Sequence, residues 1–243
     1  MGEIRAHGRH LMVMLFVAGM LVLADLPPPL PGSTETTDTQ LLTGATTMLI
    51  PPHLPARARA ALRALLDGNR RFISGSPTYS RDISSARAAA GGQRPIAAVF
   101  TCVDSRVTAE SLFDCDFGQL IVVRTAGHVP DRAAVGSLRF AVDALAVPLV
   151  IVLGHERCGA VKLAVDTLRD PNRPEQLDYL VEQLSDPVAK ALSDGAADPC
   201  ATAMRLQIDQ TVAVLKGDPG VAAASIVGAR YDLDNGTVSV HSA

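Results

Sequence analysis

The sequence predicts an α/β fold in which helices cover both faces of a central parallel sheet. Short, almost wholly apolar runs of strand length recur along the chain, which is typical of strands buried on both faces. Segments with helical periodicity separate these runs, and this alternation favours a single parallel sheet, here with the strand order 2-1-3-4. A turn signal, Asp234-Asn235-Gly236, joins the last two strands, so we expect an antiparallel strand at the edge of the sheet.

Each element in the first half of the domain has its own pattern. Apolar residues at helical spacing indicate helices, whereas uninterrupted apolar runs indicate buried strands. Gly75, Ser76 and Pro77 end the first helix, and Pro130 with Asp131 begins a later one. In chain order we expect a helix at Pro55–Phe72, a strand at Ile96–Thr101, a short helix at Ala109–Phe113, a strand at Leu120–Arg124 and a helix from Pro130 to about Leu145.

The second half of the domain continues the alternation. Its first element is the third and most hydrophobic strand, and a helix should begin shortly after it. The predicted elements are a strand at Leu149–Leu153, a helix from about Cys158, helices at Glu175–Ser193 and Ala201–Lys216, and strands at Ser225–Tyr231 and Thr237–His241.

The first fifty residues differ from the rest of the chain. Leu11 through Ala24 are uncharged and almost wholly apolar, but as a helix they would span only about 21 Å, less than the roughly 30 Å of a bilayer core. We therefore expect a signal-peptide-like or anchor segment at residues 1–25, a disordered linker at 26–50 and one globular domain at 51–243. If residues 1–24 are a signal, the protein is exported or held in the cell envelope, and membrane contact is limited to this segment. The alternative is a cytoplasmic protein whose true start is Met48.

Composition excludes several classes of protein. The net charge is −3, so the chain lacks the basic surface that a nucleic-acid partner requires. Four cysteines among 243 residues are too few for a disulfide scaffold. Any role for these cysteines must come from their positions.

Two polar segments follow neighbouring strands of the predicted sheet. Cys102, Asp104 and Arg106 come directly after the first strand and fall on one side of the chain if it stays extended. His155 and Cys158 follow the third strand, and at the start of a helix their spacing brings both side chains to one point. Two thiolates and one imidazole with a free fourth position are a known catalytic zinc arrangement. The alternatives are buried cysteines that act only as small apolar residues, and an ordinary surface ion pair.

These motifs resemble those of the β-class carbonic anhydrases. The family signature is a Cys-x-Asp-x-Arg segment after the first strand and a His-x-x-Cys segment after the third. The similarity covers roughly residues 55–243 and includes three further blocks, Leu66–Phe72, Phe117–Gly127 and Cys158–Val161. Residues 51–243 then correspond to the catalytic domain of that family.

The resemblance implies an enzyme that hydrates CO₂ reversibly to bicarbonate and a proton, by attack of zinc-bound hydroxide on CO₂. Cys102, His155 and Cys158 are the implied Zn²⁺ ligands, and Asp104 becomes a fourth ligand in a closed state of the site. Otherwise Asp104 orients the nucleophile and Arg106 holds Asp104 off the metal. The resemblance also implies that Gln93 donates a hydrogen bond to the substrate across a dimer interface, in a homodimer or tetramer.

Two positions depart from the family pattern. Val99 replaces a Trp found in relatives that bind bicarbonate at a non-catalytic site, although Arg124 of that site is present. His128 stands where many members have Asn, and it is either a loop-stabilising residue or a proton carrier near the mouth of the site.

Other functions use the same residues or the same fold. One alternative is a zinc-binding module without turnover, and another is a related zinc hydrolase of a CO₂-like molecule such as carbon disulfide. A thiol redox protein would usually carry a Cys-x-x-Cys pair, which this sequence lacks.

Overall fold

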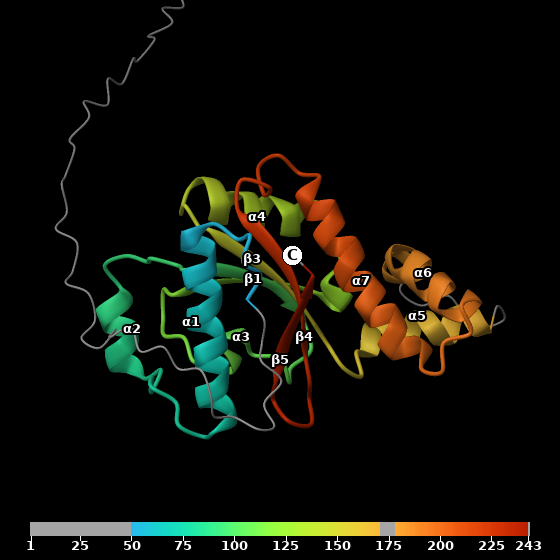
Figure 1. Cartoon of the computed structure of the whole chain (residues 1–243), viewed down its shortest axis with the longest axis horizontal. Helices are drawn as coiled ribbons and strands as arrows, with labels where there is room; N and C mark the ends of the chain where they lie inside the picture. The colour runs from blue at the N-terminus through green and yellow to red at the C-terminus, as the bar shows by residue number, and fades with distance from the viewer. Residues whose placement is uncertain (1–49, 171–177, 243) are drawn as a thin grey trace, which may run out of the picture. The chain divides into compact units, whose positions relative to one another are not determined.

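A computed structural model describes residues 50–170 and 178–242 of the chain. Its centre is a five-stranded sheet in the order β2-β1-β3-β4-β5 (Figure 1). The first four strands in that order are parallel and β5 is antiparallel to β4, which confirms the predicted sheet. The strands are β1 (Ala97–Cys102), β2 (Leu120–Thr125), β3 (Leu149–His155), β4 (Ser225–Tyr231) and β5 (Val238–Ser242).

Every residue of β1 and β3 is buried, which explains their uninterrupted apolar sequences. Because successive side chains of a strand point to opposite faces, each strand contributes to two cores. Ala98, Phe100 and Cys102 of β1 belong to one core, whereas Ala97 and Val99 belong to the other.

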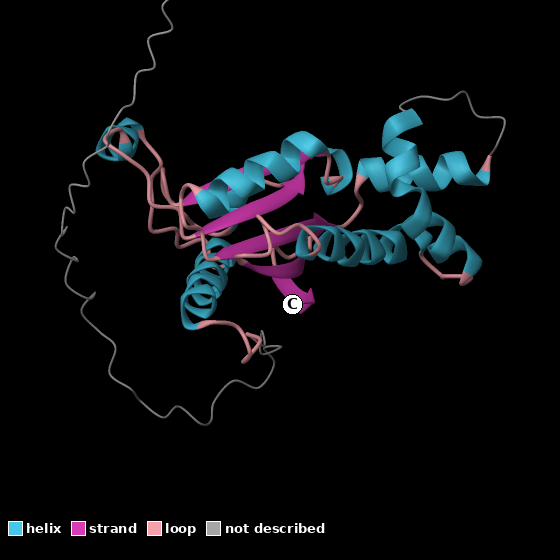
Figure 2. Cartoon of the chain, turned by 90° about the horizontal axis from the view of Figure 1, so that it is seen from above, coloured by secondary structure: helices cyan, strands magenta, loops and turns pink. Residues whose placement is uncertain are grey.

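Helices cover both faces of the sheet (Figure 2). Residues of α1 and α3 form one core with the sheet, and residues of α4, α5, α6 and α7 form the other. The helices α5, α6 and α7 pack against one another beside the carboxyl ends of β1 and β3 (Figure 1). The helices are α1 (Ala56–Ile73), α2 (Ile83–Ala89), α3 (Ala109–Leu112), α4 (Arg132–Asp143), α5 (Gly159–Arg169), α6 (Asp178–Ser193) and α7 (Pro199–Lys216), with a 3₁₀ turn η1 at Ala126–His128.

Two of the differences from the prediction have a clear physical reason. Helix α2 was not predicted, because it has no buried residue and therefore no apolar periodicity. Asp82 starts it by accepting hydrogen bonds from the amides of Ser84 and Ser85. Strand β3 continues to His155, two residues beyond the predicted end, because its pairing with β4 extends to Tyr231.

Some predictions concern residues outside the described part of the chain. These are the signal-like or anchor segment at 1–25, most of the linker at 26–50 and the first residues of the helix predicted from Glu175. Among residues 50–170 and 178–242, no helix has the length and apolar character needed to cross a membrane.

Candidate metal centre

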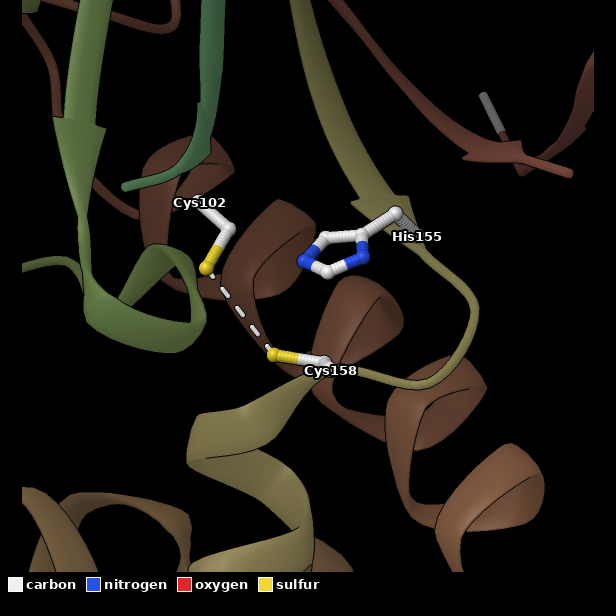
Figure 3. A group of neighbouring side chains, drawn as sticks. All are labelled: Cys102, His155 and Cys158. Atoms are coloured by element: carbon white, nitrogen blue, oxygen red, sulfur yellow. Dashed lines mark hydrogen bonds between the residues drawn. The ribbon is translucent and has the colours of Figure 1, made fainter. Parts of the chain in front are cut away.

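The carboxyl ends of β1 and β3 bring three potential metal ligands together. Cys102 is the last residue of β1, His155 is the last of β3, and Cys158 is the N-cap of α5, the residue just before the helix. Their ligand atoms all lie within 4.8 Å of one another, and the two sulfur atoms are 3.9 Å apart. All three residues are buried, and their side chains point toward a common centre (Figure 3). The predicted convergence of these residues is therefore confirmed.

The local backbone differs from the expectation that His155 and Cys158 both start a helix. His155 belongs to the strand, and Arg157 adopts a left-handed conformation with φ 49° that turns the chain into α5. The Glu156 amide donates to the Tyr231 carbonyl at 3.2 Å, and the Arg157 guanidinium binds Asp234 at 2.8 Å. These contacts fix the turn that carries the chain from one ligand to the next.

The imidazole of His155 is prepared to donate a lone pair. Its Nδ1 lies 2.8 Å from the Glu156 carbonyl oxygen, and because a carbonyl only accepts, this nitrogen must carry the proton. The other nitrogen, Nε2, is buried and has no hydrogen-bond partner among the described residues. An unpaired buried nitrogen costs free energy, and a metal ion bound to its lone pair would remove that cost. The donor set of two sulfurs and one nitrogen suits zinc.

The two thiols are in contact, so the charge on one affects the pKa of the other. The hydrogen bond with Cys158 lowers the pKa of the Cys102 thiol, and His155 and the amides of Asp104 and Gly127 act in the same direction. The same hydrogen bond, together with burial and the negative charge on Cys102, raises the pKa of Cys158, so the isolated pair retains one proton. A divalent cation between the sulfurs would neutralise both thiolates.

Asp104 and Arg106 form a bidentate ion pair beside the three ligands. Arg106 donates from Nε to Oδ1 at 2.9 Å and from Nη2 to Oδ2 at 2.7 Å. This guanidinium holds the pKa of the Asp104 carboxyl well below its usual range. Oδ2 of Asp104 also lies 3.8 Å from Nε2 of His155, which places a carboxylate at the edge of the centre.

The Asp104–Arg106 pair forms in a turn and not in an extended chain as predicted. Strand β1 ends at Cys102, and the Arg106 amide bonds back to Asp104 Oδ1 at 3.0 Å. Arg106 also donates from Nη2 to the Arg157 carbonyl at 3.3 Å, which links the two ligand-bearing segments.

Two supporting contacts were not predicted from sequence. Arg124 of β2 donates to the carbonyls of Cys102 and Asp104 at 2.9 and 2.6 Å and so fixes the segment between them. The Gly127 amide donates to the Cys102 sulfur at 3.4 Å. A glycine just after a strand indicates a tight turn, but nothing in the sequence indicates that its amide faces a sulfur.

The structure of one chain does not bring Gln93 to the three ligands. Gln93 precedes β1, whereas Cys102 ends it, and a strand of this length spans roughly 20 Å. Gln93 is exposed and lines a surface pocket together with Phe117 and Gly118.

His128 is fully buried, so it does not lie at the mouth of the site. Burial lowers its pKa to about 4, and its ring packs edge-on against Phe100 at 6.4 Å between centroids. Val99, which departs from the Trp expected at a non-catalytic bicarbonate site, is buried in the other core.

Comparisons with known proteins point to one family. The family model described as carbonic anhydrase matches residues 97–238. The chain is 39% identical to carbonic anhydrase 2 of Mycobacterium tuberculosis over 73% of this chain and 89% of that protein. It is 40% identical to a carbonic anhydrase of Mycolicibacterium smegmatis over 75% of this chain and 93% of that protein.

Solved structures agree with this result. The Coccomyxa β-carbonic anhydrase, solved with acetazolamide, is 25% identical, with a TM-score of 0.56 over 74% of this chain and 85% of that one. The β-carbonic anhydrase CcaA shares the fold at 22% identity, with a TM-score of 0.57 over 74% of this chain and 94% of that one.

Proposed function

This chain belongs to the β-class carbonic anhydrase family, whose reaction is the reversible hydration of CO₂ to bicarbonate and a proton, and we propose that it catalyses this reaction with a zinc ion held by Cys102, His155 and Cys158. The observation that carries the proposal is the convergence of two sulfurs and an unpartnered buried Nε2 within 4.8 Å of one another. A bound zinc lowers the pKa of a coordinated water toward neutrality and so supplies a nucleophile at neutral pH.

The chain's own residues prepare this centre for reaction. The His155 Nδ1–H bond to the Glu156 carbonyl fixes the tautomer and aims Nε2 at the sulfurs. We assign to Asp104 the acceptance of a hydrogen bond from the reacting water, which would orient that water toward CO₂. Arg106 keeps the Asp104 carboxylate ionised and in place, because its guanidinium binds both oxygens.

We also propose that the enzyme works as a homodimer or tetramer in which Gln93 contacts the substrate of the partner's site. The supporting observation is that β2, an edge strand of the sheet, carries four partly exposed apolar residues in sequence, Leu120 to Val123. Phe117 and Phe140 beside this edge are about half exposed. An open apolar edge favours pairing with another chain, and a structurally similar enzyme of Sordaria macrospora is described as tetrameric.

Stopped-flow CO₂ hydration on the purified full chain, with zinc content measured on the same sample, tests the proposal. Activity should rise with zinc occupancy, disappear on chelation and return when zinc is added back. Cys102→Ser should lose both zinc and activity, whereas Cys115→Ser, at a buried cysteine outside the centre, should retain both. A zinc-loaded protein that does not accelerate the reaction would instead be a binding module or act on another CO₂-like molecule.

A further inference from the structure

The turn η1 holds a conformation that its own residues do not favour. Gly127 and His128 both have left-handed backbones, with φ 59° and 45°. This conformation is easy for glycine, but it is unfavourable for a residue such as histidine and persists only where the surroundings fix it. In this shape the turn directs the Gly127 amide at the Cys102 sulfur.

Two buried polar residues of α7, Gln207 and Thr211, form hydrogen bonds with the carbonyls of the turn. Nε2 of Gln207 lies 3.4 Å from the Gly127 carbonyl oxygen and 3.3 Å from Oγ1 of Thr211. Because the Gly127 carbonyl only accepts, the Gln207 amide nitrogen must face it. Oγ1 of Thr211 in turn donates to the His128 carbonyl at 3.5 Å. The carbonyls of Gly127 and His128 are therefore both bound by one face of one helix.

The opposite side of the turn is closely packed against two helices. A Cβ at Gly127 would lie 3.2 Å from Leu184 of α6 and 3.4 Å from Ala160 of α5. The turn is thus enclosed between α5 and α6 on one side and the two hydrogen-bonding side chains of α7 on the other. Rotation of the Gly127–His128 peptide requires Gln207 to release the Gly127 carbonyl, and this peptide adjoins, at the Gly127 Cα, the peptide whose amide faces Cys102.

These polar side chains serve the turn and not the packing of α7. Gln207 and Thr211 are 1% and 0% exposed, and Oε1 of Gln207 has no hydrogen-bond partner among the described residues. A buried acceptor without a partner destabilises the folded protein. Apolar side chains on α7 would avoid that cost, but they would leave the turn's carbonyls unbound.

We infer that Gln207 and Thr211 are positioning residues of the metal centre, which act by holding the Gly127 amide on the Cys102 sulfur. This inference rests on the zinc site proposed above. An N–H bond to a thiolate withdraws charge from the sulfur, so it stabilises the ligating form and tunes how strongly the sulfur donates to the metal.

Four variants separate positioning from packing. Gln207→Met keeps the length of the side chain but removes the donor, and Thr211→Val keeps the shape but removes the hydroxyl. Thr211→Ser keeps the hydroxyl and serves as the rescue variant. Leu215→Val removes one buried methylene from the same helix about 12 Å from Gln207, and therefore controls for lost packing.

Two readouts other than activity report on the sulfur. Zinc affinity is measured by competition with a chromophoric chelator, and the sulfur-to-metal charge-transfer band is recorded after loading with Co²⁺. We expect Gln207→Met to weaken zinc binding about 10-fold and to shift the band, and Thr211→Val to do the same to a smaller degree. Thr211→Ser should match the wild type, and Leu215→Val should lower stability to urea without changing either readout.

The inference is overturned if Gln207→Met and Thr211→Val leave the affinity and the band unchanged, or if Leu215→Val changes them equally. If Gln207→Met does not fold, the zinc affinity and the charge-transfer band of Thr211→Val are compared with those of Thr211→Ser. A difference between these two variants supports the inference, and equal values overturn it. A wild-type protein that binds neither Zn²⁺ nor Co²⁺ would overturn the proposed function as well, whereas tight wild-type binding with unaffected variants overturns this inference alone.

Discussion

At the scale of single residues, the centre depends on donors and acceptors whose partners are fixed by backbone groups. The Glu156 carbonyl sets the tautomer of His155, and the Gly127 amide faces the Cys102 sulfur. Asp104 accepts from the Arg106 amide too, but it is also bound by the guanidinium of Arg106 through both of its oxygens. An asparagine at this position keeps an oxygen for the amide, and so tests a chemical role with little change in the backbone.

Asp104→Asn should reduce the rate of CO₂ hydration by about 100-fold or more, because the amide keeps the shape but loses the charge and one acceptor. Zinc content should stay at the wild-type level, since none of the three principal ligands changes. Stopped-flow rates with metal analysis on the same sample measure both quantities. Wild-type activity in this variant would remove the role assigned to Asp104.

A second residue-scale prediction concerns acid stability. Asp114 is buried, which would raise its pKa, but hydrogen bonds from Arg71 and from the amides of Thr78 and Tyr79 outweigh burial and lower the pKa to about 2. Because the folded pKa lies below the ordinary value of 3.8, the contribution is fully present above about pH 4 and is lost as the pH falls through about 2.

Asp114→Asn isolates this contribution, because asparagine tolerates the left-handed backbone at this position, where φ is 43°. The variant should be less stable than the wild type by about 2 kcal/mol at pH 7. The difference should shrink by about 1 kcal/mol at pH 3. Urea unfolding of both proteins at the two pH values measures it, and a difference that grows in acid would contradict the assignment.

At the scale of elements, α1 and α3 approach so closely that only glycine fits between them. A Cβ at Gly68 of α1 would lie 1.8 Å from the Phe113 carbonyl oxygen at the end of α3. Asn69, the next residue, donates to the Leu112 carbonyl at 3.1 Å and to the Gly236 carbonyl at 2.9 Å. These two positions connect the first helix to the short helix and to the final hairpin.

Gly68→Ala should therefore destabilise the protein by several kcal/mol, although alanine is ordinarily about 1 kcal/mol better than glycine within a helix. Gly136→Ala in α4 is the matched control, since a Cβ there meets nothing within 4 Å, and it should be neutral or slightly stabilising. Thermal unfolding of the two variants compares them. Equal stability would mean that α1 and α3 separate at little cost.

Most elements could be predicted from the sequence because each one buries a face, and a buried face requires apolar residues at the regular spacing of a helix or a strand. It could not predict α2, which buries nothing, or the end of β3 at His155, which is set by pairing with β4. The three ligands were found because Cys and His at strand ends are chemically distinctive. Gln207 and Thr211 were missed because, within a helix, their polar side chains have no local signature of the turn that they bind.

At the scale of the whole molecule, the active unit is proposed to need two chains. Gln93 lies at the end of β1 opposite the metal centre, so it does not reach the metal centre of its own chain. An assembly through the β2 edge would instead present Gln93 to a partner. The two halves of one site then come from different copies.

Complementation between two defective variants tests this arrangement. Gln93→Leu lacks the substrate contact and Cys102→Ser lacks a metal ligand, so each protein alone should be severely impaired. When the two chains are coexpressed, a mixed dimer contains one site with all metal ligands and an intact Gln93 from the partner, and activity should recover. Activity no higher than the average of the two separate proteins would contradict a shared site.

The central claim is that two sulfurs and one imidazole nitrogen from separate segments hold a single zinc ion. X-ray absorption at the zinc edge on the purified protein tests it most directly. We predict two sulfur ligands at about 2.3 Å and at least one nitrogen ligand at about 2.0 Å. One sulfur should disappear from the spectrum in either Cys102→Ser or Cys158→Ser. A zinc environment of nitrogen and oxygen only, unchanged by these substitutions, would contradict the account.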